Sequence, residues 1–156
     1  LLIQGIKSTR ILHRYDVENI SDETYSTART TIFAEPPVDL VYDETIEIDE
    51  NDRIFSIEYL PGQYDQRADS ASQCIQIIAH GDRPNIKYAK VVIVKGNISD
   101  SDFDKIKKYI INPVDSREAL DKKPSTVDYE STTIIQFDER YTNVFRKYLR
   151  TSKKKK

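Results

Sequence analysis

The stretch "RIFSIEYLPGQYDQRADSASQCIQIIA", residues 53–79, contains the pattern of a strand, a turn and a helix in succession. Its first seven or so residues alternate between apolar and polar side chains, which predicts a strand with one buried face. The Pro-Gly pair at 61–62 interrupts this alternation and favours a turn. A helix is then expected from about Asp65 to Ala79, with the Asp65 carboxylate as its N-cap.

The predicted helix is amphipathic, and its two faces differ in character. The apolar spacing predicts a buried stripe of Ala68, Ala71, Cys74, Ile75 and Ile78. The outer face mixes Gln, Ser, Asp and Arg, whereas a merely solvated face usually carries Lys and Glu. Short polar side chains of this kind suit specific hydrogen bonds, so we favour a docking surface over a solvated helix face. Its residues on this segment are Gln63, Tyr64, Asp65, Gln66, Arg67, Asp69, Ser70 and Gln73.

A second pattern is an internal repeat, in which residues 19–39 align with residues 97–115. Both segments begin with Asn-Ile-Ser-Asp and end with Pro-Val-Asp, and the apolar spacing between these ends predicts a helix in each. Ser21 and Ser99 are the expected N-caps, and the isoleucine before each serine is expected to pack across its cap. Pro36 and Pro113 are expected to stop the two helices. We interpret the agreement as a duplication.

The second copy supplies a complete unit, and the first lacks its beginning. After the opening strand and helix of the second copy, we expect a strand over 86–95, a helix over 100–111 and another strand within 126–137. In the first copy "TRILHRYDV" and "VYDETIEID" are the expected strands, and "LLIQG" corresponds to the helix end "IIAHG", where the glycine takes the left-handed cap position. The chain contains no methionine, and we expect a fragment of a longer protein.

The sequence therefore predicts an α+β protein of two tandem ferredoxin-like strand–helix–strand–helix units. The first repeat spans 1–49 and lacks its opening strand and most of its first helix, and the second spans 53–130. The two sheets are expected to pack together or to join edge to edge. Residues 131–156 form an unassigned tail, which has a short amphipathic pattern and a basic C-terminus.

Composition and motifs argue against several classes of function. The net charge of -2 predicts no general attraction to nucleic acid or to anionic membranes, and no apolar run is long enough to cross a bilayer. Metal-ligand spacings and glycine-rich phosphate loops are absent. His13 and His80 are expected to be structural or surface residues, and Cys74 is expected to be buried and not a nucleophile. The sequence places no two carboxylates as an acid/base pair. We therefore assign no catalytic, cofactor-binding or metal-binding residue.

Four motifs occur in the order of a known family. The segments "RYDVENIS", "FAEPPVD", "IEYLPGQYDQRADSASQCIQII" and "YIINPVDSRE" together resemble the N-terminal region of phosphoribosylformylglycinamidine synthase. The long single-chain bacterial form is the nearest in pattern, over roughly residues 2–124, and there this region resembles a fused pair of the separate small subunit. The last motif adds Asn112 and Arg117 to the candidate interaction surface.

The resemblance implies an assembly role inside a larger enzyme. The family is an ATP-dependent C–N ligase of purine biosynthesis, which amidates formylglycinamide ribonucleotide with ammonia from glutamine and uses magnesium. Its nucleotide site and its cysteine nucleophile belong to other domains, so no catalytic residue carries over. The implied partners are the synthase and glutaminase domains, which this region bridges and between which it helps to guide ammonia in the cytoplasm. Self-association is a further expectation.

Two alternatives remain open from the residues alone. One is a free-standing α+β module that binds a ligand or RNA, since Tyr88 stands beside Lys87 and Lys90 as in a sparse RNA-binding pattern. The other is an independent small enzyme, which the missing catalytic constellations make the weakest of the three.

Overall fold

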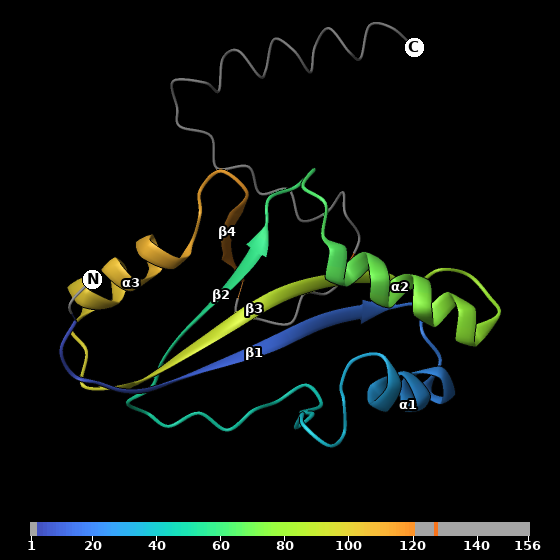
Figure 1. Ribbon diagram of the computed structural model, residues 1–156, viewed down its shortest axis with the longest axis horizontal. Coiled ribbons are helices and arrows are strands. Elements are labelled where there is room, and N and C mark those ends of the chain that lie inside the picture. Colours follow the sequence, from blue (N-terminus) through green and yellow to red (C-terminus); the bar gives the residue numbers. More distant parts are fainter. Residues whose placement is uncertain (1–2, 121–126, 128–156) are drawn as a thin grey trace, which may run out of the picture.

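The computed structural model describes residues 3–120 and Val127, and it has an α+β architecture. These residues form four strands and three helices, in agreement with the predicted class (Figure 1). In chain order they are β1 (Ile6–Glu18), α1 (Asp22–Thr31), β2 (Arg53–Tyr59), α2 (Gln66–Ala79), β3 (Asn85–Gly96), α3 (Asp100–Ile110) and β4 (Ser116–Ala119).

The described strands form one antiparallel sheet in the order β1-β3-β2-β4. β3 is central and pairs with β1 from Ile6↔Gly96 to Glu18↔Asn85, with one irregularity at the start of β1. On its other edge β3 pairs with β2, and β2 pairs with β4. The described residues therefore contain one sheet, and not two sheets that pack face to face.

The main core lies between α3 and the sheet. α3 presents Phe103 and Ile106 to β3, and the rings of Phe55 and Phe103 meet edge to face with centroids 5.6 Å apart. Ile98 belongs to the same buried cluster as Phe103, which agrees with the predicted packing across the cap. The cluster consists of Phe55, Val92, Val94, Ile98, Phe103 and Ile106.

The helices α2 and α3 pack on the same face of the sheet, which we call the helix side. Val92 and Val94 of β3 contact the α3 cluster, and Tyr88 carries Arg67 of α2 over its ring. Because alternate residues of a strand share a face, Tyr88, Val92 and Val94 all point to the helix side. α1 packs beside α2. Phe33, which follows α1, contacts Tyr15 with the two ring centroids 5.0 Å apart.

The three predicted N-caps are confirmed. Ser21 accepts a hydrogen bond from the Thr24 backbone N–H at 3.2 Å, and Ser99 accepts one from the Asp102 backbone N–H at 3.1 Å. Asp65 accepts one from the Ala68 backbone N–H at 3.1 Å. Each cap satisfies a donor that the first turn of a helix leaves without a partner, a contribution of about 1 kcal/mol.

The predicted buried stripe of α2 is partly wrong. Ala68, Ala71 and Ile75 are buried, but Cys74 is exposed and Ile78 is 39% exposed. Ser72 completes the stripe instead, because its hydroxyl donates to the Pro84 carbonyl at 2.7 Å and holds that face of the helix against the connection to β3. The C-terminal end of α2 extends past the end of β1, where none of the four described strands lies beside it (Figure 1).

Two predictions for the first copy are wrong: the helix end before its first strand and the strand after its helix. Residues 3–5 are not helical, and Gly5 instead crosses the backbone at the end of β3, where a Cβ would overlap the Asn97 carbonyl. Residues 41–49 do not form a strand. Single side chains hold that segment: Asp43 bonds Tyr25 and Arg29, and the Lys95 ammonium lies 2.6 Å from Asp49.

Two further details differ from the prediction. The left-handed residue after α2 is His80, with φ 52°, and not the glycine that follows it. β4 pairs with β2 through Ser116–Ala119, a strand that the sequence pattern did not predict. The strand expected within 126–137 lies outside the described residues except for Val127, and so does the whole tail 131–156.

Candidate interaction surface

The candidate surface begins at the turn between β2 and α2. Gly62 adopts φ 90°, and the Gln63 backbone N–H donates to the Leu60 carbonyl at 3.0 Å to close the turn. The Leu60 backbone N–H donates to the Asp115 carbonyl at 2.8 Å, which holds this turn against the loop between α3 and β4. Two segments far apart in the sequence, which both contribute predicted surface residues, therefore lie side by side.

A shallow groove lies between this turn and the start of β3. Gln63, Asp65 and Arg117 all line it, so the structure brings together three of the predicted residues. Arg117 is ion-paired with Glu58 at 2.7 Å on the neighbouring strand. The groove measures about 70 Å³. A small-molecule pocket usually measures about 300–1,000 Å³, so the groove can hold a few waters and not a substrate.

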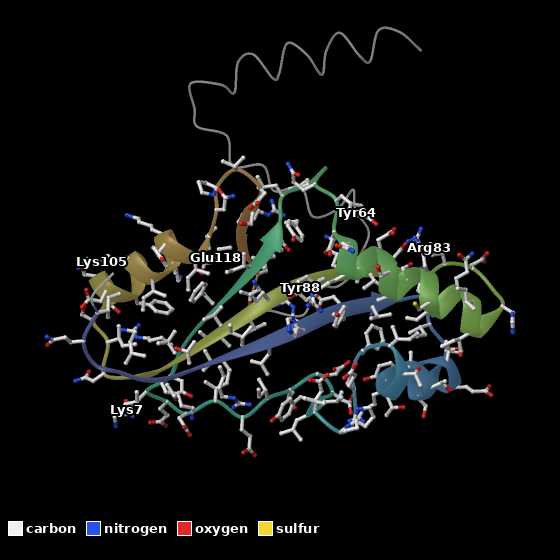
Figure 2. All side chains as sticks on the ribbon, in the orientation of Figure 1. Lys7, Tyr64, Arg83, Tyr88, Lys105 and Glu118 are labelled. Atoms are coloured by element: carbon white, nitrogen blue, oxygen red, sulfur yellow. The ribbon has the colours of Figure 1, made fainter. Side chains whose placement is uncertain are left out.

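Asp69 is the centre of a hydrogen-bonded network on the outer face of α2. It accepts from the Tyr64 hydroxyl at 2.9 Å and from the Gln73 amide at 2.7 Å, and it is ion-paired with Arg83 (Figure 2). The Tyr64 hydroxyl and Arg83 lower the pKa of the Asp69 carboxyl, and the same bond raises the pKa of Tyr64. Three of the predicted surface residues thus bond to one another within the chain.

Arg83 links this network to a buried hydroxyl. Its Nε donates to the Ser72 Oγ at 2.9 Å, and Ser72 in turn donates to the Pro84 carbonyl at 2.7 Å. Ser72 is 5% exposed, so water cannot readily replace either bond. The polar residues around the end of α2 therefore have a structural role in holding the connection to β3.

The Ser72→Ala variant is expected to lose about 1–3 kcal/mol of unfolding free energy, because the Pro84 carbonyl and Arg83 Nε lose a buried partner. Urea denaturation monitored by circular dichroism measures the loss. Ser70→Ala, at an exposed position of the same helix, is the matched control and should change the free energy by less than about 0.5 kcal/mol. Equal effects of the two variants would show that Ser72 does not hold the connection.

Arg67 does not lie on the outer face of α2 with its predicted neighbours. Its guanidinium carbon is 5.5 Å from the centroid of the Tyr88 ring, and hydrogen bonding to the Tyr15 hydroxyl raises the pKa of Arg67. His13 lies in the same place, with its Nδ1 2.6 Å from the Tyr88 hydroxyl and its ring stacked on Tyr88 at 5.7 Å. This cluster was not predicted as a site.

The remaining predicted residues divide between exposed and structural positions. Gln63, Gln66 and Ser70 are exposed and lie on the turn and first turns of α2. Asn112 instead builds the loop before β4, because its side-chain oxygen accepts from the Val114 backbone N–H at 3.2 Å. The side chains that remain open to a partner are therefore fewer than the sequence predicts.

The described residues contain no group of three or more His, Cys, Asp or Glu side chains that could hold a metal ion. Among the helices of residues 3–120, none has the length and apolar character needed to span a membrane. Comparison with protein-family models, with curated proteins and with solved structures found no match to this chain.

Proposed function

We propose that this chain is a non-catalytic assembly domain of phosphoribosylformylglycinamidine synthase in its long single-chain bacterial form. The four ordered motifs support this identification. The structural observation that carries the proposal is the pairing of β1 with β3, two long strands that each lead into a serine-capped helix. In the parent enzyme, ATP, magnesium and glutamine act in other domains to amidate formylglycinamide ribonucleotide.

The geometry of the strand pair supports a duplicated, ferredoxin-like unit. β1 and β3 run antiparallel and oppose each other along their whole length, so α1 and α3 follow at opposite ends of the pair. Two copies related by a two-fold axis normal to a sheet have this arrangement. The order β2-α2-β3-α3-β4 is the more complete copy, and β1 with α1 represents the other.

The assembly role rests on surface that the fold does not use internally. Gln63, Gln66 and Ser70 are exposed at the start of α2, and β1 is an edge strand of the described sheet. Exposed edge strands favour pairing with another chain, which fits both domain docking and self-association. In this proposal the domain bridges the synthase and glutaminase parts in the cytoplasm and helps to guide ammonia between them.

A surface substitution tests the docking face. Ser70→Arg should weaken the association of this chain with separately produced synthase and glutaminase parts by about tenfold, because a long charged side chain disturbs the centre of the face. Isothermal titration calorimetry measures the affinity. Ser101→Arg, an equally exposed serine on α3, is the matched control and should bind as the wild type does. Unchanged binding by Ser70→Arg would contradict docking through this face.

The second candidate is a free-standing ligand-binding module, which the group of cationic side chains around Tyr88 favours. The RNA-binding version has less support. Tyr88 is 8% exposed, so its ring is not free to stack on a base. Lys87, its neighbour on β3, points to the opposite face of the sheet by strand alternation.

A further inference from the structure

The helix side of the sheet carries a group of cationic and histidine side chains between β1, β3 and α2. His13 pairs with Lys90 across the two strands, so both side chains project from the same face a few ångströms apart. Arg67 reaches the same place from α2, because its guanidinium lies over the ring of Tyr88. We call His13, Arg67 and Lys90 the cationic group.

The charges of this group are not neutralised by close carboxylates. The ion pairs among the described residues all use other Arg and Lys side chains, and no described carboxylate lies within 4.0 Å of Arg67 or Lys90. The acids that act on the group do so at longer range, Asp39 on His13 and Asp65 on Arg67. The chain as a whole has a net charge of -2, so a group of cations without a carboxylate in direct contact is unusual for it.

Tyr88 orients the imidazole of His13. Desolvation, Arg67 and Lys90 lower the pKa of His13, and burial raises the pKa of the Tyr88 phenol, so at neutral pH the imidazole is neutral and the phenol keeps its hydrogen. A neutral imidazole that accepts from the Tyr88 hydroxyl at Nδ1 carries its own hydrogen on Nε2. His13 is an exposed residue, and its ring then has an N–H donor at Nε2.

We propose that His13, Arg67 and Lys90 form a binding site for a phosphate-type dianion, either inorganic phosphate or the phosphate of a monoester. The Arg67 guanidinium supplies paired N–H donors and the Lys90 ammonium supplies a mobile point charge. The His13 imidazole supplies a further hydrogen-bond donor at Nε2–H. The site depends on residues outside the exposed docking face at Gln63, Gln66 and Ser70. It is therefore independent of the assembly role.

Histidine NMR provides the test, because the chain has two histidines and His80, at the end of α2, is an internal control. Inorganic phosphate is titrated at constant ionic strength, and phosphoserine is titrated separately as the monoester. The His13 ring signals should shift saturably with at least one of these probes and the pKa of His13 should rise, since a bound dianion favours the charged imidazole. The His80 signals should not change.

Neutral variants connect the shift to the cationic group. Lys90→Gln and Arg67→Gln should each weaken the apparent affinity about two- to fivefold, whereas Lys105→Gln on α3, whose ammonium is paired with Asp102, should have no effect. Unchanged His80 signals verify that each variant is folded. The proposal is overturned if neither probe shifts His13, if His13 and His80 shift alike, or if Lys90→Gln binds as tightly as the wild type.

Discussion

The Phe55→Ala variant is expected to lose about 3–5 kcal/mol of unfolding free energy, the largest effect of any single truncation on β2. Phe55 is fully buried and contacts the edge of the Phe103 ring, so it joins the sheet to α3. Removing the ring takes apolar surface out of the core and leaves a cavity that the rigid strand pair β2–β3 cannot close. Urea denaturation followed by circular dichroism measures the loss.

Ile77→Ala is the control for this prediction, since Ile77 is 70% exposed on α2. Its truncation should change the unfolding free energy by less than about 0.5 kcal/mol, because the side chain gains little from folding. A Phe55→Ala loss as small as that of the control would mean that the core between α3 and the sheet is not as described.

The Gly96→Ala variant is the second strong prediction, with an expected loss of about 3 kcal/mol or more. Gly96 ends β3 with φ 142°, a conformation that L-residues rarely adopt, and a Cβ there would overlap the Gly5 carbonyl. The backbone of residues 5–7 lies directly against Gly96 at this end of the β1–β3 ladder, so neither strand can move aside without breaking the first pairs of the ladder. Thermal and urea unfolding both measure the effect.

Gly62→Ala separates the two causes of this loss. Gly62 also has a positive φ, 90°, but a Cβ there would have no atom within 4 Å. Its substitution should therefore cost only the conformational part, about 1–2 kcal/mol. If Gly96→Ala were no worse than Gly62→Ala, the close approach of the Gly5 backbone to Gly96 would be contradicted.

Much of the fold could be predicted because its signals are local. Alternation predicts β2, and serine or aspartate before an apolar period predicts the starts of α1, α2 and α3 at Ser21, Asp65 and Ser99. A cap bonds a backbone group three residues away, so the sequence around it contains most of the information.

The errors occur where structure depends on distant partners. Residues 41–49 alternate like a strand but pair with none of the described strands, while the four residues of β4 form a strand only because β2 offers an edge to pair with. The phase of α2 was also misjudged, since Ser72 is buried through its bond to the Pro84 carbonyl while Cys74 is exposed. The apolar periodicity of a helix does not reveal such a hydrogen bond.

The contacts of the candidate surface could not be predicted from the sequence. The unusual polar composition at the start of α2 suggested side chains open to a partner, but Asp69 binds Tyr64, Gln73 and Arg83 within the chain. The His13–Tyr88 bond could not be predicted, because it depends on the register of β1 against β3. The one available signal in the sequence was the spacing of His13 and Tyr15. These residues are two apart in a predicted strand, so their side chains share a face.

Sedimentation velocity of this chain mixed with separately produced synthase and glutaminase parts tests the proposed assembly role most directly. We expect a faster boundary that contains both components at micromolar concentration, and no ligase or glutaminase turnover by the chain alone. Independent sedimentation of the components at tens of micromolar, or measurable turnover by the isolated chain, would contradict it.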